Sequence, residues 1–587
     1  MKKSKWLALL MAATMVMGVM TGCGGSDTNA PATGDAGTTA TTEKKDEKKD
    51  DKKDDKKDSK GGEQVINLSS GSIVVGLNPI QNTTSPDNSA HNKVCDTLVR
   101  HNAVEGNTTE IVPSAAESWD VSEDGLTYTF HMRENAKWSD GVPLTANDFE
   151  YTFKLMADPN SGSTSGWLFD GIIENFGEAL YSKGKTPDEI AVKALDDKTL
   201  EVKLVHPASY FLELLHAVYP VRQDKYEEWG DAYGSSADKI ICSGPFMVES
   251  WNQNTEMILV KNPNFWNAEN VKLDKIHTRI IQENATAVQA FLSGEIDITS
   301  TSDANWQNMI EESGLAITEV VPDNAPEFLM CNLQNEYLSN TKIRQALSIA
   351  FDREQYIQDL WNGNGTPLYS VMPDTMMVGD TPYHELVNDR NHFVKTMQEE
   401  NPDPKALLIE GLKELGKSED PSQVTIRYAS RGTGEISKKI AEWFKQTWET
   451  KLGINVQIDM LEWNIMWDKI DAGDYDLACG GWGPYYNEPS AILTLFDPIN
   501  GYFNAKKMGW TNENADKFKA ICDQATNTVD VSEKVELYLQ AEELLVKDAI
   551  IMPEYLSNSP TYVAKYVKNY PICTNGSIDW SQVYIEK

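Results

Sequence analysis

Residues 115–154 have the sequence AAESWDVSEDGLTYTFHMRENAKWSDGVPLTANDFEYTFK. Within it, LTYTFHM at 126–132 alternates apolar and polar residues, which predicts a half-buried strand. The pair Asp140-Gly141 predicts a turn, because glycine accepts a positive φ at low cost. Thr145 is a suitable helix N-cap, and Asp148 places an acid in the first turn. The stretch therefore predicts a strand, a turn and a helix, and by itself it indicates no chemistry.

Further along the chain, strand patterns and helix patterns alternate, which is typical of α/β folds. The apolar stripe of 341–361 predicts a helix. A strand–helix–strand crossover unit is predicted for the segments VTIRYAS, SKKIAEWFKQTWETKLGI and INVQIDML at 424–430, 437–454 and 454–461. With 587 residues, the chain is long enough for two or three domains.

The N-terminus has the features of an export signal. Lys2, Lys3 and Lys5 precede an apolar run at 6–20, which is short for a membrane span. The run ends in Met20-Thr21-Gly22-Cys23, which resembles the bacterial lipobox, although leucine is more usual at its first position. This resemblance implies a signal peptide at 1–22, cleavage before Cys23 and lipidation of its thiol, so that the protein is anchored to the cell membrane without spanning it. The alternative is an ordinary signal peptide followed by a chance cysteine.

Residues 23–62 have the composition of a flexible linker. The second half, EKKDEKKDDKKDDKKDSKGG at 43–62, has no apolar residue that could enter a core. As a flexible coil, a tether of roughly 35 residues spans about 30–35 Å. The alternative, a lysine-rich arm that binds an anionic surface, is disfavoured by the interleaved acids.

The charge and the cysteines exclude several classes of function. A formal net charge of −36 argues against nucleic acid as a partner, since phosphates attract lysine and arginine. The six cysteines after Cys23 contain no C-x-x-C pair, so they predict neither a disulfide framework nor a zinc site. We expect buried free thiols, no metal and no cofactor.

Several short motifs accompany residues 115–154 and lead to a family. They are Leu77-Asn78-Pro79, Ser243-Gly244-Pro245-Phe246, Asn262-Pro263-Asn264-Phe265-Trp266, Ser293-Gly294-Glu295-Ile296-Asp297 and Arg344-Gln345-Ala346-Leu347 with Asp352-Arg353. These motifs occur in the same order as in the oligopeptide- and dipeptide-binding proteins of ABC importers, solute-binding protein family 5. The chain therefore resembles this family. Asn78 is a small departure, because the family has aspartate there.

The resemblance implies an architecture of two α/β lobes that close on a ligand, a periplasmic-binding-protein-like fold of type II. Lobe I is expected at about 63–324, with the extra subdomain of this family at about 99–240. Lobe II is expected at about 325–547, and 548–587 is expected to return to lobe I. The partners implied are a peptide or other small solute and the membrane permease subunits of an ABC importer.

The segment GGWGPYYNEPSAI at 480–492 resembles the loop that lies in the cleft of this family. The resemblance makes its central residues candidate ligand-binding residues: Trp482, Gly483, Tyr485, Tyr486, Asn487 and Glu488. Peptide binders have an aspartate at the position of Tyr485, where it pairs with the free α-ammonium of the peptide. A phenol with a pKa of about 10 is neutral and cannot replace that counter-charge. We therefore expect no dependence on a free α-amine, unless Glu488 supplies the charge.

The opposing wall is expected from the segment after Leu77-Asn78-Pro79. Asn82, Thr83, Thr84 and Ser85 match cleft-lining positions of the family, although a polar surface loop has the same composition. Trp167 and Arg431 are further candidates. Arg431 would suit a carboxylate through its planar fork, and the alternative is a surface arginine.

No catalytic constellation is present in the sequence. His384-Glu385 lacks a second histidine at zincin spacing, and neither a G-x-S-x-G motif nor a Walker glycine loop occurs. We therefore predict a solute-binding protein for import and no enzyme. Peptides are the expected ligands, and oligosaccharides or other amine-free solutes are the alternative.

Overall fold

The computed structural model describes residues 62–81, 84–104, 108–320, 323–379, 381–499, 501–503, 505, 507–558, 560–573 and 577–587. The predicted signal peptide, Cys23 and nearly all of the predicted linker lie outside these residues.

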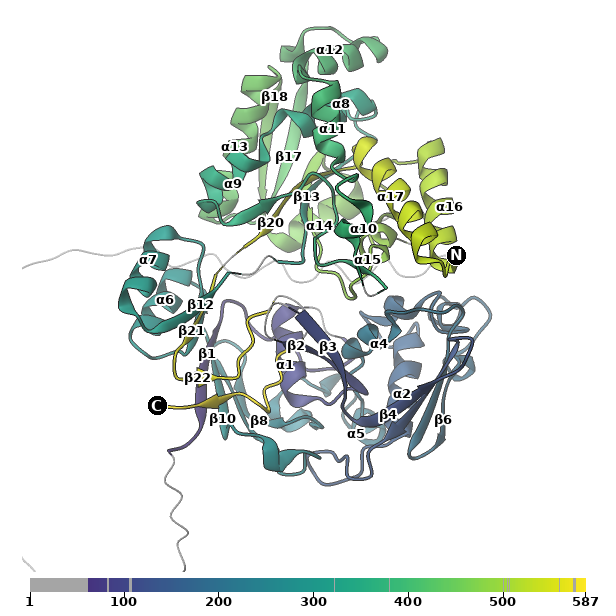
Figure 1. The fold of residues 1–587 in the computed structure, drawn as a ribbon, viewed down its shortest axis with the longest axis vertical. Coiled ribbons are helices and arrows are strands. Elements are labelled where there is room, and N and C mark those ends of the chain that lie inside the picture. Colours follow the sequence, from purple (N-terminus) through teal and green to yellow (C-terminus); the bar gives the residue numbers. More distant parts are fainter. Residues whose placement is uncertain are drawn as a thin grey trace, which may run out of the picture. The chain divides into compact units, whose positions relative to one another are not determined.

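Two separate hydrophobic cores define two lobes (Figure 1). The core of lobe I contains buried residues from Ile66 to Ile310 and again from Tyr562 to Val583. The core of lobe II contains buried residues from Phe328 to Tyr555. The chain thus passes between the lobes twice, once before Phe328 and once after Tyr555. The expected two-lobed α/β fold is confirmed.

Lobe I contains a mixed sheet in the order β1-β10-β9-β8, an antiparallel sheet in the order β4-β5-β7-β6 and smaller sheets. Its strands are β1 (Val65–Ser70), β2 (Val99–Val104), β3 (Thr108–Pro113), β4 (Ala116–Val121), β5 (Thr127–Met132), β6 (Val192–Asp196), β7 (Thr199–Lys203), β8 (Phe246–Asn252), β9 (Glu256–Lys261), β10 (Lys275–Ile280), β11 (Ile298–Ser300), β12 (Ala316–Glu319), β21 (Thr561–Ala564), β22 (Val567–Lys568) and β23 (Tyr584–Ile585). Its helices are α1 (Ser85–Val94), α2 (Ala146–Ala157), α3 (Phe176–Leu180), α4 (Phe211–Leu214), α5 (Gln223–Trp229), α6 (Asn284–Leu292) and α7 (Ala304–Ser313).

Residues 115–154 contain the predicted strand, turn and helix start. Their alternating residues form β5, in which partly buried and fully buried side chains also alternate. Gly141 has a φ of 88°, as the predicted turn requires. The backbone N–H of Thr145 donates to the Asp148 carboxylate at 2.8 Å, where α2 begins. The hydrogen bond explains why an acid stands three residues after the cap.

Lobe II is built on one six-stranded sheet in the order β14-β20-β13-β19-β17-β18. Its strands are β13 (Glu327–Cys331), β14 (Gly365–Pro367), β17 (Thr425–Arg431), β18 (Asn455–Leu461), β19 (Leu477–Gly481) and β20 (Ile551–Ser557), with β15 (Met377–Val378) and β16 (Thr381–Pro382) as a separate pair. Its helices are α8 (Thr341–Ala350), α9 (Arg353–Trp361), α10 (Tyr383–Val387), α11 (Phe393–Glu400), α12 (Pro404–Glu414), α13 (Glu435–Lys451), α14 (Trp463–Ala472), α15 (Ser490–Leu493), α16 (Glu513–Asn527) and α17 (Val531–Lys547).

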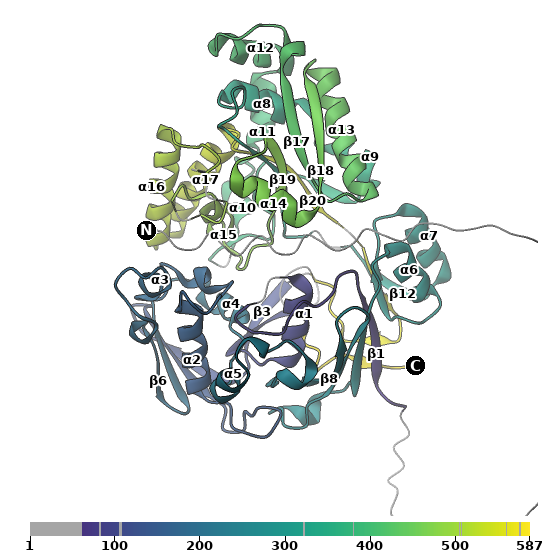
Figure 2. The same ribbon diagram turned by 180° about the vertical axis from the view of Figure 1, so that it is seen from behind.

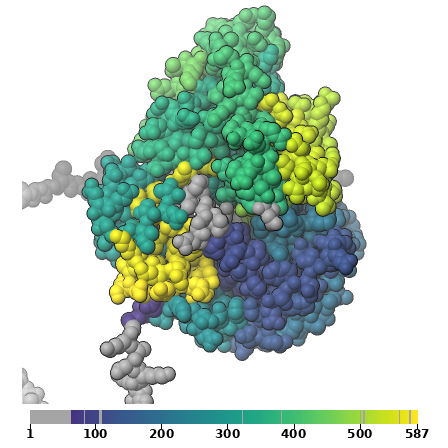
Figure 3. All heavy atoms as spheres, viewed as in Figure 1, coloured from purple at the N-terminus to yellow at the C-terminus, as the bar shows by residue number. Residues whose placement is uncertain are grey.

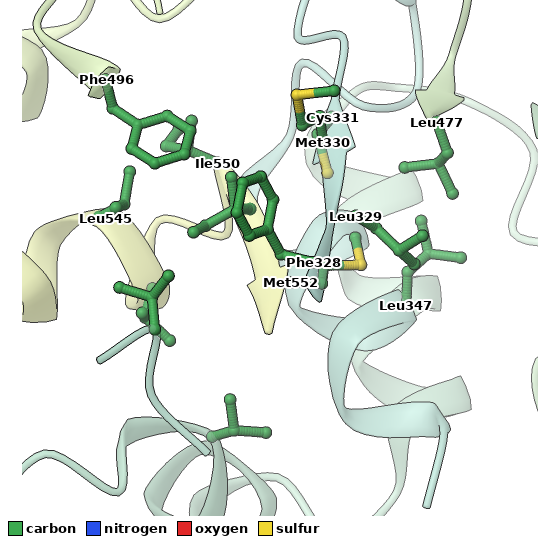
Figure 4. Packing of buried hydrophobic residues seen from close by; sticks show 14 of the residues in the cluster. Phe328, Leu329, Met330, Cys331, Leu347, Leu477, Phe496, Leu545, Ile550 and Met552 are labelled. Atoms are coloured by element: carbon green, nitrogen blue, oxygen red, sulfur yellow. The ribbon is translucent and has the colours of Figure 1, made fainter. Parts of the chain in front are cut away.

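The predicted crossover unit is confirmed in this sheet. Strands β17 and β18 are parallel, and α13 connects them and packs beside them (Figure 2). The central strand β13 pairs antiparallel with both β19 and β20. Its side chains Phe328, Leu329 and Met330 are buried among apolar residues of neighbouring strands and helices (Figure 4). Strand β19 stays paired with β13 as far as Gly480 and Gly481, the first residues of the segment 480–492, which we call the cleft loop.

The single helix predicted for 341–361 is wrong, because the structure divides it into α8 and α9. Phe351 is extended, with φ −96° and ψ 138°. The Asp352 carboxylate then accepts hydrogen bonds from the N–H groups of Glu354 and Gln355, both at 3.0 Å. An aspartate that caps a new helix stabilises the break, which the apolar stripe alone does not show.

The chain returns to lobe I near its end. Strand β20 pairs with β13 in lobe II, whereas β21 pairs with β11 and β12 of lobe I. The space-filling view shows these C-terminal residues beside the segment that contains α6, α7 and β12 (Figure 3). We therefore propose that the return begins after Ser557 rather than at about 548, and the other predicted domain bounds stay proposals.

A buried histidine makes the stability of lobe I dependent on pH. His91 in α1 is fully buried, stacks on Tyr219 at 4.8 Å and has a pKa of about 4, chiefly because burial disfavours the imidazolium. The unfolded chain binds this proton near pH 6.5, so the free energy of unfolding falls as the pH drops from 6.5 to 4. The His91→Gln variant lacks this contribution to the pH dependence, because glutamine does not titrate. We expect the stability difference between wild type and variant to shrink by about 3 kcal/mol between pH 7 and pH 4, measured by urea unfolding. A difference that stays constant over this range would contradict the assignment.

Candidate ligand-binding site

The cleft loop starts at two glycines that stand close to neighbouring side chains. A Cβ on Gly480 would lie 2.9 Å from the Phe328 ring, and one on Gly481 would lie 2.7 Å from the Glu327 carboxylate. At Gly480 the buried Phe328 ring leaves no room for a side chain, whereas at Gly481 the Glu327 carboxylate would have to move aside. After Gly481 the chain leaves the sheet and enters the space between the lobes.

The cleft loop lines a cavity of about 530 Å³, which we call the interlobe cavity. Lobe II contributes Trp482, Gly483, Tyr485, Tyr486 and Asn487. Lobe I contributes side chains from α1, β2 and the region of α4, including Ser85, His101, Glu213 and His216. The volume lies within the range of typical small-molecule sites, and the lining combines aromatic rings with a few polar groups.

The segment Ser209–Glu213 of lobe I is in direct contact with the cleft loop. Tyr210 stacks on Tyr486 with ring centroids 4.0 Å apart. The backbone N–H of Asn487 donates to the Glu213 carboxylate at 2.8 Å. The Ser209 hydroxyl donates to the Glu488 carboxylate at 3.1 Å. These contacts join the two lobes at one edge of the interlobe cavity.

Aromatic side chains from both lobes gather around Trp482. Trp167 of lobe I lies 6.0 Å from Trp482 and 5.8 Å from Tyr485, measured between ring centroids. Tyr502 completes the group at 4.7 Å from Trp482. Burial raises the pKa of Tyr485, so its phenol is neutral at physiological pH. Two candidates from the sequence, Trp167 and Tyr485, are thus in mutual contact.

Glu488 lies outside the interlobe cavity, although the sequence made it a candidate for contact with the ligand. Its side chain is buried, and its carboxylate forms an ion pair with Lys534 at 3.3 Å. The Tyr538 hydroxyl also donates to it. Since its charge already has a partner within lobe II, Glu488 serves to hold the end of the cleft loop.

Of the other candidate residues predicted from the sequence, only some line the interlobe cavity. Ser85 lines the interlobe cavity, whereas Thr84 caps α1 and accepts from the N–H of Asp87 at 3.3 Å. Arg431 pairs with Glu327 at 3.0 Å and does not line this cavity. Asn82 and Thr83 lie outside the described residues. The structure therefore brings together Ser85 and most of the cleft loop, with Trp167 beside them.

Several lining residues were missed by the sequence analysis, among them Glu213, His101 and His216. Burial lowers the pKa of His101 to about 4, with a smaller effect of His216, and burial also lowers the pKa of His216. Both imidazoles are therefore neutral at pH 7. No linear motif marks these residues, because they become neighbours only when the extra strands and helices of lobe I fold.

The described part of the chain contains no cluster of three or more histidine, cysteine, aspartate or glutamate side chains that is suited to a metal ion. Cys95, Cys242, Cys331, Cys479 and Cys522 are buried free thiols, as expected, whereas Cys573 is only partly buried. Among the described helices, none has the length and apolar character of a membrane span.

Two α/β lobes with an aromatic and polar cavity between them define a solute-binding protein. Comparison with known proteins gives the family: the model of bacterial extracellular solute-binding proteins, family 5 Middle, matches residues 110–503. The chain therefore belongs to the family 5 solute-binding proteins of ABC importers, as the motifs predicted. Members of this family are substrate-binding proteins of transporters and not enzymes.

Individual relatives cover most of the chain. The dipeptide-binding protein DppE of Bacillus subtilis is 31% identical over 81% of this chain and 84% of its own length. The periplasmic oligopeptide-binding protein OppA of Salmonella typhimurium is 30% identical, over 86% and 90%. The substrate-binding domain of an oligopeptide ABC transporter from Bacillus anthracis has a similar structure, with a TM-score of 0.75 and 26% identity over 90% of this chain and 99% of that domain.

Proposed function

We propose that this protein captures peptides in the interlobe cavity and delivers them to the permease of an ABC importer. The observation that carries the proposal is the position of the cleft loop, whose residues Trp482 to Asn487 form one wall of the cavity. Relatives of similar length are described as dipeptide- and oligopeptide-binding proteins, which supports a peptide as the ligand.

The chemistry of the cavity suits a peptide. Side chains such as Ser85 and the two neutral histidines can exchange hydrogen bonds with peptide N–H and C=O groups. Trp482 and Tyr485 provide apolar faces for side chains of varied shape. A cavity with neutral polar groups and large rings can bind a main chain without strict selection of its sequence.

One observation favours a second candidate, a ligand without an amine. Tyr485 stands where peptide-binding relatives are expected to have aspartate, and its pKa is raised by burial. A neutral phenol can hydrogen-bond a sugar hydroxyl as well as a peptide group. An oligosaccharide or another amine-free solute is therefore the alternative to a peptide.

Mass spectrometry of the compounds that co-purify with the mature domain tests the choice between these ligands. The domain is purified, unfolded to release its ligand, and the filtrate is compared with that of the Trp482→Ala variant. We expect short peptides in the wild-type filtrate and a marked depletion in the variant. Sugars or other amine-free compounds with the same depletion would support the alternative and contradict the peptide proposal.

We also propose that Cys23 is lipidated and anchors the protein to the outer face of the cell membrane. The support is the lipobox-like Thr21-Gly22-Cys23 at the end of the signal core. We expect Cys23→Ser to accumulate as unprocessed precursor or to be shed into the medium. Cell fractionation and the mass of the mature N-terminus measure this outcome. Normal processing and membrane retention of Cys23→Ser would refute the anchor.

A further inference from the structure

Glu213 places a carboxylate at the junction of the two lobes. It lies in α4 of lobe I, and its side chain lines the interlobe cavity. Its Oε2 atom accepts the hydrogen bond from the N–H of Asn487 at 2.8 Å. An ionised carboxylate has about four acceptor sites, so this bond leaves most of its capacity for other donors.

The surroundings of Glu213 provide it with little positive charge. Among the described residues, no lysine or arginine lines the interlobe cavity. Lys534 is paired with Glu488 at 3.3 Å, and the pKa values of His101 and His216 are lowered by burial. Burial raises the pKa of Glu213 itself, and the charge of Glu488 raises it further. A partly buried anion in this position is stabilised when a cation enters the cavity.

Building on the proposed function, we propose that Glu213 recognises a cationic nitrogen of the ligand, either the α-ammonium of a peptide or the side chain of its lysine or arginine. The geometry points to a charge-assisted hydrogen bond from this nitrogen to the Glu213 carboxylate. The neutral Tyr485 by itself predicts no dependence on an amine. Glu213 alters that expectation, since it supplies the cavity with a carboxylate from the opposite lobe.

The same residue links recognition to closure. Glu213 belongs to lobe I and Asn487 to lobe II, so their hydrogen bond forms where the lobes meet. A ligand cation that binds Glu213 keeps its carboxylate ionised, and an ionised carboxylate is the stronger acceptor for the Asn487 N–H. The ligand charge therefore favours the arrangement in which the lobes are in contact.

Glu213→Gln separates charge from hydrogen bonding, because the amide oxygen can still accept from Asn487. Calorimetry compares the wild-type mature domain with this variant on three peptides of the same length. The first has a free N-terminus and a lysine side chain, the second is its N-acetylated form, and the third replaces lysine by norleucine. Glu227→Gln, at an exposed site on α5, is the control for net charge. The unfolding transition of each variant is recorded beforehand.

For wild type and Glu227→Gln we expect the loss of one cationic group, by acetylation or by norleucine, to weaken binding about tenfold or more. The peptide that shows the loss identifies whether the α-ammonium or the side chain contacts Glu213. In Glu213→Gln this discrimination is expected to fall to within about twofold.

Equal binding of all three peptides to wild type would overturn the role of Glu213 while leaving peptide capture intact. Discrimination that persists in Glu213→Gln would overturn it as well. If wild type binds none of the peptides but binds an uncharged sugar, peptide capture is contradicted, and the proposed role of Glu213 is contradicted with it. Should Glu213→Gln not fold, the wild-type comparison of the three peptides still decides whether a ligand cation is recognised.

Discussion

Arg344→Met is expected to lower the free energy of unfolding of lobe II by about 3 kcal/mol. Arg344 is buried in α8, where its guanidinium pairs with the Asp548 carboxylate at 3.1 Å and donates to the Leu338 carbonyl at 2.8 Å. Removing the arginine leaves Asp548 buried without its cation. The indole N–H of Trp510 still donates to that carboxylate at 2.7 Å, so the loss falls at the lower end for a broken buried pair.

Lys342→Met on the same helix is the matched control. Lys342 forms ion pairs with Glu410 and Glu414 at 3.0 and 2.8 Å, but these pairs are exposed. Exposed pairs contribute less than about 1 kcal/mol, so the control should unfold nearly as wild type does. Urea unfolding of both variants measures the difference. Equal stabilities of the two variants would contradict a larger contribution of the buried pair to the free energy of unfolding.

Trp482→Ala is expected to weaken ligand binding by about 2 kcal/mol, or roughly thirty-fold. Trp482 lines the interlobe cavity and lies 4.7 Å from Tyr502 and 6.0 Å from Trp167, measured between ring centroids. Its loss removes apolar area from the wall of the cavity, and truncation of a large aromatic side chain in a binding site is often costly. It also removes a contact between the lobes, so closure is weakened together with affinity.

Tyr181→Ala controls for the loss of an aromatic residue elsewhere in the protein. Tyr181 follows α3 in lobe I and is 45% exposed. Titration calorimetry with the ligand recovered from the wild type should give an unchanged affinity for this control. Wild-type affinity in Trp482→Ala, at unchanged stability, would exclude the aromatic wall from the binding site.

Local structure could be predicted from the sequence where it depends only on residues that are close together in the chain. The alternation in LTYTFHM and the pair Thr145 and Asp148 produce β5 and the start of α2, because strand alternation and helix capping depend on nearby residues. The prediction of a single helix over 341–361 failed because the apolar pattern does not show where one helix ends and the next begins. A continuous apolar face fits two helices as well as one, and the break at Phe351 depends on the Asp352 cap.

The sequence indicated most of the lobe II side of the candidate site, but on the lobe I side it indicated only Ser85 as a lining residue, with Trp167 beside it. The glycines and rings of the cleft loop stand together in the sequence, and Trp482 to Asn487 indeed line the interlobe cavity. Glu213 and His101 come from distant segments of lobe I, and their proximity exists only in the folded chain. The position of Glu488 could not be inferred either, since its partner Lys534 is 46 residues away.

Small-angle scattering of the mature domain tests most directly the claim that a solute is captured between the two lobes. The domain is freed of ligand by unfolding and refolding, then measured alone and with a saturating amount of the ligand identified by mass spectrometry. A ligand shifts such an equilibrium only if it binds one arrangement of the lobes better. We predict a smaller radius of gyration with ligand than without it. An identical scattering profile at saturation would contradict capture by closure of the lobes.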